Sequence, residues 1–306
     1  MNYTALVNRS FAIAWKHRYL WVFGFFAGLG GNTLGNIGGR GGNEQAGRLF
    51  EWTASHPVLL LVIIMGGVIL WCVLTALQSL SFGALIGATG DLLIDRANDF
   101  DRSLEAGFRY FWRVFGLQLL LGLTILGIVA ITVIPPLLLL LTKQTGLIIL
   151  AVAWLVILAL PFIAAVATAT VVWDFALRFG VLRDRKAGNA LGEGWRLFRN
   201  NLGRSAAVWG VMAALGLAFS FAVMLAVVML GLPFLIAGAI NPWLGIIPSV
   251  LIGLPLMIVM ISMYGVFDVA YWSAVFLDLT TTAPADAPAI PPPGEPFELP
   301  PAAGMA

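Results

Sequence analysis

Four long runs without a charged residue limit what this chain can fold into. They cover residues 57–90, 114–142, 144–173 and 205–267, and the last extends for 63 residues. A helix needs ~20 apolar residues, at a rise of about 1.5 Å each, to cross the ~30 Å hydrocarbon core of a bilayer. Each run therefore suffices for one membrane crossing, and the last suffices for two, with Asn241–Pro242 as the natural turn between them.

The overall composition agrees with a polytopic membrane protein. The chain has 306 residues, of which 60% are hydrophobic and only 10% are charged, whereas soluble domains carry about 25% charged residues. A net charge of +2 is too small to indicate a nucleic-acid partner. The single cysteine, Cys72, lies inside an apolar run and excludes an internal disulfide.

The first apolar segment, residues 19–31, is short for a membrane crossing. Its helix either begins upstream, with Lys16 and Arg18 reaching the interface along their aliphatic stems, or forms a re-entrant segment. With this segment counted, the sequence predicts an all-α fold of six transmembrane helices in three hairpins. We expect the third span, residues 114–142, to be stopped by Pro135–Pro136 and a loop holding Lys143.

An amphipathic helix, with aromatic residues on its apolar face, is predicted before each hairpin. At 100° per residue, residues 102–116 place one apolar and one charged face on opposite sides. Residues 191–204 repeat this arrangement, and residues 10–16 form a weaker copy. The apolar face in the first case consists of Leu104, Phe108, Phe111, Trp112 and Phe115, and the charged face of Arg102, Glu105, Arg109 and Arg113.

These copies predict internal repeats near 5–90, 98–178 and 186–278, within one membrane domain covering residues 1–278. The remainder, 279–306, is rich in proline and acidic residues, and we expect a disordered cytoplasmic tail. Its PxxP motifs could dock a protein partner, and a plain solvated tail is the alternative.

The distribution of basic residues predicts the orientation. The segments before helix 1, between helices 2 and 3, and between helices 4 and 5 hold 14 lysines and arginines, against 3 on the opposite side. The positive-inside rule then places both termini in the cytoplasm and the protein in a cell inner membrane.

The three amphipathic helices would lie at the inner leaflet, with aromatic side chains at the headgroup boundary and basic ones facing anionic lipid. The alternative is that they serve only as topology determinants and hairpin connectors. The candidate lipid contacts are Trp15, Lys16, Phe108, Arg109, Phe111, Trp112, Trp195, Arg196, Phe198 and Arg199.

No catalytic, cofactor-binding or metal site is predicted. The chain has two histidines and no H-E-x-x-H, G-x-S-x-G or P-loop pattern. Asp91, Asp95 and Asp99 are spaced by four and would share a helix face, where they could hold Mg²⁺ for a diphosphate substrate. However, the D-G-x-x-A-R pattern of CDP-alcohol transferases is missing, so the solvated end of a long helix is the competing interpretation.

Three acids mark the places where even-numbered helices leave the membrane: Asp91, Asp174 and Asp268. Ionisable residues at membrane depth are functional candidates. Helix termination and hydrogen bonding between helices are the alternative explanation.

The aromatic–basic pairs Trp15–Lys16, Phe108–Arg109 and Trp195–Arg196 carry a family resemblance. Over roughly residues 5 to 278, the chain resembles uncharacterised bacterial six-helix membrane proteins. These are similar to the membrane domain attached to some glycerophosphoryl diester phosphodiesterases, whose catalytic barrel is absent here. The resemblance implies an architecture and an association with lipid or envelope processes, not an activity.

The leading hypothesis is a non-catalytic membrane protein that associates with lipid or acts as a scaffold. A small-solute or lipid transporter is the alternative, supported by Pro161, Pro233 and Pro255 within spans and by the repeats. An aspartate-dependent intramembrane transferase is the third possibility. The sequence does not indicate an oligomeric state.

Overall fold

The described part of the chain is helical throughout. The computed structural model describes residues 2–29, 57–142 and 144–281, and these contain no strand. A 3₁₀ turn, Arg18–Leu20, precedes the second helix, and a π-helical segment, Ser249–Gly253, precedes the last. The α-helices are α1 (Tyr3–Lys16), α2 (Trp21–Leu29), α4 (Pro57–Leu93), α5 (Phe100–Leu141), α6 (Thr145–Leu182), α7 (Ala187–Asn200), α8 (Leu202–Ile240), α9 (Pro242–Pro248) and α10 (Leu254–Thr281).

Five stretches among the described residues are long and apolar enough to cross a membrane. They are Val58–Leu93, Phe100–Leu139, Gly146–Leu182, Leu202–Ile240 and Trp243–Thr281, the last combining α9, the π-helical segment and α10. The described part of the first segment, α2, has only nine residues. Residues 30–56, which follow it, and the proline-rich residues from 282 onward lie outside the described residues.

Of the two features expected to stop the third span, Pro135–Pro136 do not stop it, whereas the helix does end close to residue 142. Helix α5 continues through both prolines to Leu141, and α6 and α8 likewise contain Pro161 and Pro233. In an apolar medium an unwound backbone finds no water to bond, so the helix is kept around a proline. The predicted turn at Asn241–Pro242 is confirmed: Asn241 ends α8, and its side chain accepts from the Trp243 amide to begin α9.

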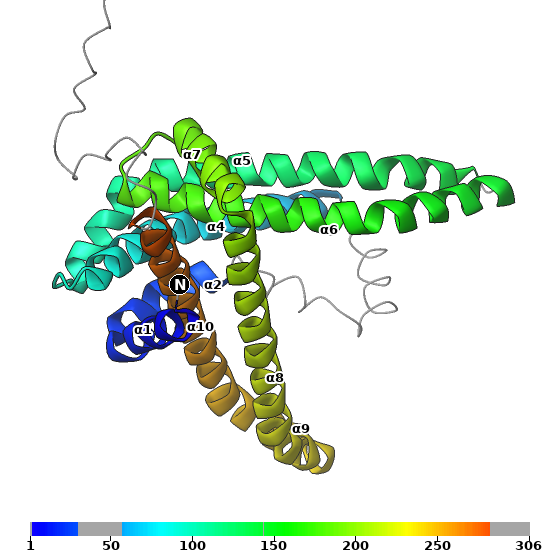
Figure 1. Cartoon of the computed structure of the whole chain (residues 1–306). Helices are drawn as coiled ribbons and strands as arrows, with labels where there is room; N and C mark the ends of the chain where they lie inside the picture. The colour runs from blue at the N-terminus through cyan, green and yellow to red at the C-terminus, as the bar shows by residue number, and fades with distance from the viewer. Residues whose placement is uncertain (1, 30–56, 143, 282–306) are drawn as a thin grey trace, which may run out of the picture.

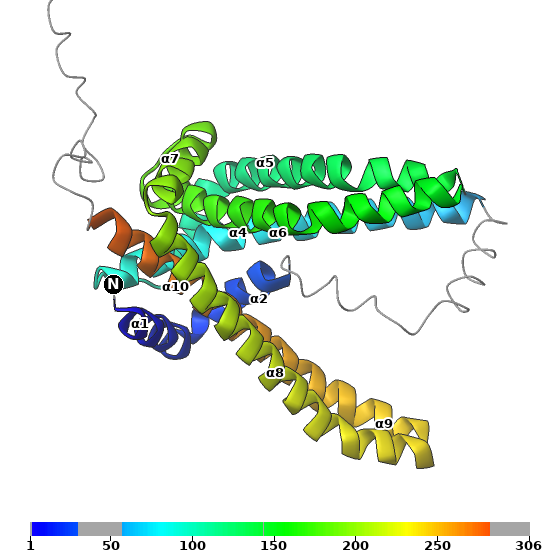
Figure 2. The same cartoon turned by 45° about the vertical axis from the view of Figure 1, so that its right-hand side comes forward.

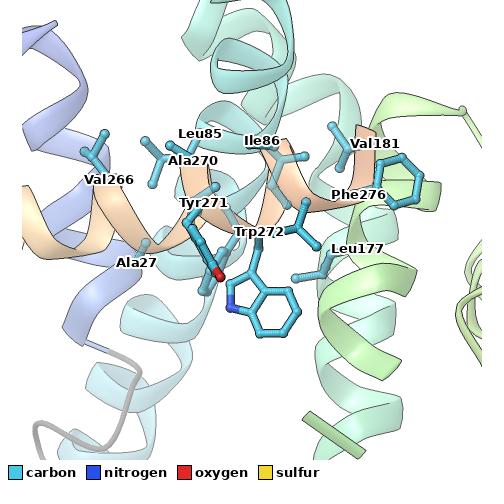
Figure 3. Packing of buried hydrophobic residues seen from close by; sticks show 14 of the residues in the cluster. Ala27, Leu85, Ile86, Leu177, Val181, Val266, Ala270, Tyr271, Trp272 and Phe276 are labelled. Atoms are coloured by element: carbon cyan, nitrogen blue, oxygen red, sulfur yellow. The ribbon is translucent and has the colours of Figure 1, made fainter. Parts of the chain in front are cut away.

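Buried side chains are concentrated where α1, α2 and the beginnings of α5, α7 and α8 meet the ends of α4, α6 and α10. We call this region the hub (Figures 1 and 2). Helix α10 runs through its middle, and almost every residue from Gly265 to Phe276 is buried. Figure 3 shows Leu85 of α4 and Leu177 of α6 packed near Trp272 of α10. The hub therefore joins parts of the chain that are far apart in sequence.

Two arms of exposed apolar helix extend from the hub and diverge from each other in both views (Figures 1 and 2). The first arm consists of residues 58–78, 118–141 and 146–170, and the second of residues 213–261. At most 6% of the most hydrophobic window of each candidate span is buried. Each helical pass in an arm has ~20–28 residues, or ~30–40 Å, which matches a bilayer. Lipid is the medium that such surfaces require.

The charged residues are all at the hub end of the described structure. The 14 lysines and arginines among the described residues lie in α1, the 3₁₀ turn, the α4–α5 connection, the first half of α5, the end of α6, the α6–α7 connection, α7 and the start of α8. Neither arm carries a charged side chain. The hub is thus the polar, basic end of the molecule.

Candidate functional site

The end of α6 contains a buried ion pair. Arg178 is fully buried, and its Nη1 donates to the Asp174 carboxylate at 2.6 Å and to the Asp174 carbonyl oxygen at 2.9 Å. The two residues are one helical turn apart, so α6 alone sets their geometry. A buried guanidinium is costly unless it is paired and hydrogen-bonded. The pair is therefore an integral part of the hub.

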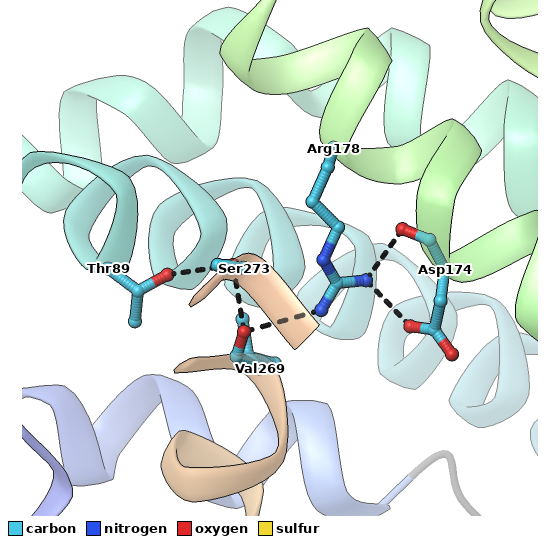
Figure 4. A network of polar contacts seen from close by, with 5 residues as sticks. All are labelled: Thr89, Asp174, Arg178, Val269 and Ser273. Carbon is cyan, nitrogen blue, oxygen red and sulfur yellow. Dashed lines mark hydrogen bonds and ion pairs between the residues drawn. The ribbon is translucent and has the colours of Figure 1, made fainter. Parts of the chain in front are cut away.

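The same arginine reaches across to the second arm. Its Nη2 lies 3.3 Å from the Val269 carbonyl oxygen of α10, which also accepts from the Ser273 hydroxyl at 2.8 Å. The Thr89 hydroxyl of α4 lies 3.2 Å from that of Ser273. Figure 4 shows these five residues as one polar network. It connects α4 and α6 of the first arm to α10 of the second.

A second carboxylate lies beside this network. Asp268 precedes Val269 on α10 and interacts electrostatically with both Asp174 and Arg178. The Nε of Arg178 is buried without a hydrogen-bond partner among the described residues. The aromatic pairs Phe175–Trp272 and Phe179–Phe276 pack edge to face between α6 and α10, with centroids 5.8 and 4.9 Å apart.

The structure brings together two of the three acids predicted at the membrane edge, but not the third. Asp91 lies in the last turn of α4, where its carboxylate accepts from the Asn98 side chain at 3.1 Å. Sequence reasoning identified Asp174 and Asp268 separately and missed Thr89 and Ser273. The only available signal for these two was a small polar residue within an apolar run.

The shared face proposed for Asp91, Asp95 and Asp99 does not exist, so that prediction is wrong. Helix α4 ends at Leu93, and Asp95 adopts a left-handed conformation with φ 58°. The amide of Arg96 donates to the Asp91 carbonyl oxygen at 2.9 Å, which closes the helix end. Asp99 instead begins α5 by accepting from the Arg102 amide. No group of three potential metal ligands occurs among the described residues.

Most of the predicted aromatic lipid contacts are exposed on the hub surface. Trp112 and Phe108 of α5 are 77% and 65% exposed, and Trp15 and Trp195 are each about half exposed. Phe111 is half-buried and stacks on Phe115. The predicted basic contacts are also exposed: Lys16, Arg109, Arg196 and Arg199.

Phe198 does not behave like the other aromatic residues on the predicted face. It is half-buried and packs against the hub core, as does its neighbour Leu197. Its sequence equivalent Phe111 has no such contact with that core. The face drawn from the sequence is therefore divided, with Trp195 facing outward and Phe198 contributing to packing.

The amphipathic stretches pack through a third face made of small residues. Gly107 of α5 crosses α4 so closely that an added Cβ would lie 2.8 Å from the Leu80 carbonyl oxygen. Gly194 of α7 crosses α6 in the same way, 2.9 Å from the Val172 carbonyl oxygen. The buried small pairs are Ser10 and Ala14, Ser103 and Gly107, and Ala190 and Gly194. Small residues at this spacing allow backbones to approach.

One basic residue of the predicted charged face is committed to a protein contact. Arg113 pairs with Asp184 at 2.5 Å, which ties α5 to the connection between α6 and α7. Asp184 has φ 54° and lies just beyond the end of α6, so it is positioned by the same kind of helix ending as Asp95. Arg113 is thus less available to lipid than Arg109.

An apolar cavity of about 370 Å³ lies in the second arm, between α8 and the π-helical start of α10. Val227, Gly231 and Phe234 line one side, and Val250 and Met257 line the other. The hydroxyl of Ser249, the polar side chain in its lining, already donates to the Gly245 carbonyl oxygen. Such a cavity fits a hydrocarbon chain and offers no polar group to orient a polar solute.

Comparison with known proteins gives one match. A model described as "Family of unknown function (DUF7544)" covers residues 13–282. No curated protein and no solved structure matches the chain. The match shows no link to the glycerophosphoryl diester phosphodiesterase membrane domain.

Proposed function

The chain belongs to this family of unknown function, and we propose that it is a non-catalytic integral protein of the inner membrane that binds lipid through its hub and serves as a scaffold there. The observation that carries the proposal is the exposure of Phe108, Trp112 and Trp195 on amphipathic segments that also present exposed arginines. These rings lie at the end of the molecule from which two apolar arms extend.

The proposed topology has six crossings, with the hub on the cytoplasmic side. Helix α4 begins at the end of the first arm remote from the hub, whereas α1 lies in the hub (Figure 2). The chain has to change sides between these two helices, so α2 is proposed to begin the sixth crossing. The basic hub supports a cytoplasmic location, since lysines and arginines favour that side.

The expected energetics favour the interface. Transferring one large aromatic side chain from water to an apolar medium is worth roughly 1.5–3 kcal/mol. Each basic residue close to an anionic leaflet adds about 1 kcal/mol. Trp112 and Trp195, with Arg109 and Arg196 beside them, have no protein core to enter. Several such contacts together would hold the hub firmly at the headgroup level.

The proposed internal repeat gains support from the third, small-residue face. In each copy a buried pair of small residues precedes the aromatic–basic pair by the same spacing. Gly107 comes directly before Phe108–Arg109, and Gly194 directly before Trp195–Arg196. Ala14 holds the corresponding place before Trp15–Lys16. Three hairpins with equivalent hub segments are the simplest scheme with these features.

Two further elements of the proposal concern partners. The apolar cavity beside Gly231 would accept the acyl chain of a membrane lipid, in keeping with a lipid-associated role. The PxxP motifs of the tail, such as Pro288–Pro291, lie outside the described residues and remain a proposed docking segment for a protein partner.

The test is hydrogen exchange of residues 187–200 in nanodiscs of neutral and of anionic lipid. Wild-type α7 should be more protected with anionic lipid. Trp195→Ser with Arg196→Gln should remove that difference, because both lipid contacts are lost. Phe198→Ser is the matched control, and it should reduce protection equally in both lipids, since Phe198 packs on protein. Equal protection of the wild-type segment in the two lipids would contradict the proposal.

A transporter is the second candidate, and the buried Asp174–Arg178 network favours it. Charged groups between two membrane arms are where coupling ions bind in transporters. A flux assay in proteoliposomes distinguishes the candidates: solute movement lost in Arg178→Gln but kept in Arg199→Gln would favour transport over scaffolding.

A further inference from the structure

The connection between α6 and α7, residues 183–186, is folded against α5, and we call it the basic connection. The Asp184 carboxylate accepts from the Arg113 guanidinium of α5 at 2.5 Å. Three residues further along α5, a Cβ added to Gly116 would lie 3.9 Å from the Cβ of Ala187, the first residue of α7. The basic connection therefore lies beside the point where α5 passes from the hub into the first arm.

The charges of the basic connection and its ion pairs do not balance. Asp184 is bound to the α5 arginine, and Glu193 of α7 accepts from Nε of Arg185 at 3.2 Å. In the described part of the chain, neither Arg183 nor Lys186 makes a side-chain hydrogen bond or an ion pair. The group thus has four basic and two acidic side chains, and two positive charges lack a partner.

Arg183 is the less solvated of these two cations. Lys186 is exposed, whereas Arg183 is half-buried where α6 ends. Burial, and then the positive charge of Arg185, lowers the pKa of Arg183 below its ordinary value, although Glu193 acts in the opposite direction. An arginine remains charged at neutral pH, so this guanidinium has lost part of its water without gaining an anion in return. Its planar fork matches two oxygens of a phosphate group.

We propose that the basic connection binds the headgroup of a doubly charged phospholipid, with one phosphate on Arg183 and the second negative charge on Lys186. Such a headgroup supplies the two negative charges that the unpaired cations require. The lipid chains would lie along the first arm, where Leu119 and Leu120 are exposed just beyond the α5 residues that contact the connection. The site rests on the proposed lipid-binding role of the hub and gives that role a location and a class of lipid.

The direct test is native mass spectrometry of the full chain released from micelles that contain cardiolipin, phosphatidylglycerol or phosphatidylcholine. The wild type should retain one cardiolipin, phosphatidylglycerol more weakly and phosphatidylcholine least, in the order of their negative charge. Arg183→Gln should weaken cardiolipin binding by about tenfold, since hydrogen bonds to a charged group are lost. Arg183→Lys should keep part of the affinity, because the charge remains but the planar fork does not.

Arg199→Gln is the matched control for the loss of one positive charge. Arg199 is exposed in the last turn of α7 and, among the described residues, has no ion pair either. A diffuse basic surface would respond alike to Arg183→Gln and Arg199→Gln, whereas a defined site responds mainly to the first. Equal weakening by the two substitutions would overturn the site but leave the lipid-binding role of the hub intact, and hydrogen exchange of α7 tests that role separately.

Glu193→Gln supplies a result that damage to the fold does not imitate. It releases Arg185 from its ion pair, so a third cation becomes free and cardiolipin binding should strengthen. Glu105→Gln, at an exposed position of α5 two turns before Arg113, removes the same charge outside the site and should have little effect. Weaker binding in Glu193→Gln would mean that the ion pair only holds the connection in place, which would contradict the proposal.

Inorganic phosphate distinguishes a lipid from a soluble ligand at the same cations. In excess it should leave cardiolipin bound, because it lacks the chains that contact the first arm. Displacement of cardiolipin by inorganic phosphate would assign Arg183 and Lys186 to a soluble phosphate compound and overturn the lipid site. Equal retention of all three lipids by the wild type would overturn the recognition of headgroup charge.

Discussion

Gly107 of α5 crosses α4 so closely that a Cβ added to this glycine would lie 2.8 Å from the Leu80 carbonyl oxygen. The neighbouring backbone cannot move aside as a flexible side chain would.

We therefore expect Gly107→Val to destabilise the protein by about 1–3 kcal/mol, the usual cost of overpacking. The measurement is the free energy of unfolding in detergent. Gly122→Val, on the same helix but with open space around the glycine, is the matched control and should have a small effect. Equal losses in the two variants would show that helix propensity, not the crossing, determines the result.

The topology can be tested at both ends of the molecule. In a Cys72→Ser background, single cysteines replace Ile240 and Thr142 at the far ends of the two arms and Asn200 in the hub; all three positions are exposed. A membrane-impermeant maleimide applied to spheroplasts should label the cysteines at positions 240 and 142 and not the one at position 200. Labelling of Asn200 together with Ile240 from that side would exclude the proposed arrangement.

Filling the second-arm cavity should displace a lipid chain. Gly231 lines the cavity, and a Cβ there would meet nothing within 4 Å, so Gly231→Leu should fold normally while occupying the space. Crosslinking of a phosphatidylglycerol with a photoactivatable acyl chain to α8 and α10 should fall several-fold. Gly210→Leu, an open glycine of α8 outside the cavity, should leave crosslinking unchanged. Undiminished crosslinking in Gly231→Leu would mean that the cavity is empty of lipid.

Acid should weaken the junction between α1 and α2 through His17. Burial, and then the positive charge of Lys16, lowers the pKa of His17 below its usual 6.5. The unfolded chain then binds this proton more readily than the folded one, so stability is complete above pH 6.5 and falls as the pH drops toward the lowered pKa. His17→Gln should reduce the difference between the Tm at about pH 7.5 and at about pH 5.5.

Lys16→Gln should reduce the same Tm difference partially, since it removes only the smaller of the two causes. The quantity to compare is the change of Tm with pH, not the Tm itself, because His17 also contacts the Tyr19 ring and its loss would lower the Tm at every pH. If the Tm of His17→Gln changed with pH as much as that of the wild type, the acid sensitivity would belong to other groups.

Much of the outline could be predicted from local properties. Apolar length indicates the arms, and the clustering of basic residues indicates the hub end, because both depend only on solvent transfer of individual side chains. The exposed positions of Trp15, Phe108, Trp112 and Trp195 are compatible with the predicted apolar faces. The end of α4 at Leu93 was missed, because the spacing by four of Asp91, Asp95 and Asp99 resembles one helix face even where Asp95 turns the chain.

The sequence by itself determined that this is a helical membrane protein with a basic end. It also determined that amphipathic segments carry aromatic residues on one face and charged residues on the other, since periodicity and hydropathy are properties of neighbouring residues. Only the tertiary structure decided that Gly107 and Gly194 form the packing face and that Phe198 turns inward. It alone also brought the Val269 carbonyl oxygen of α10 to Arg178 of the Asp174–Arg178 pair. The physical reason is that close backbone approach and charge pairing depend on which distant helix lies opposite, and α6 and α10 are separated by more than 70 residues.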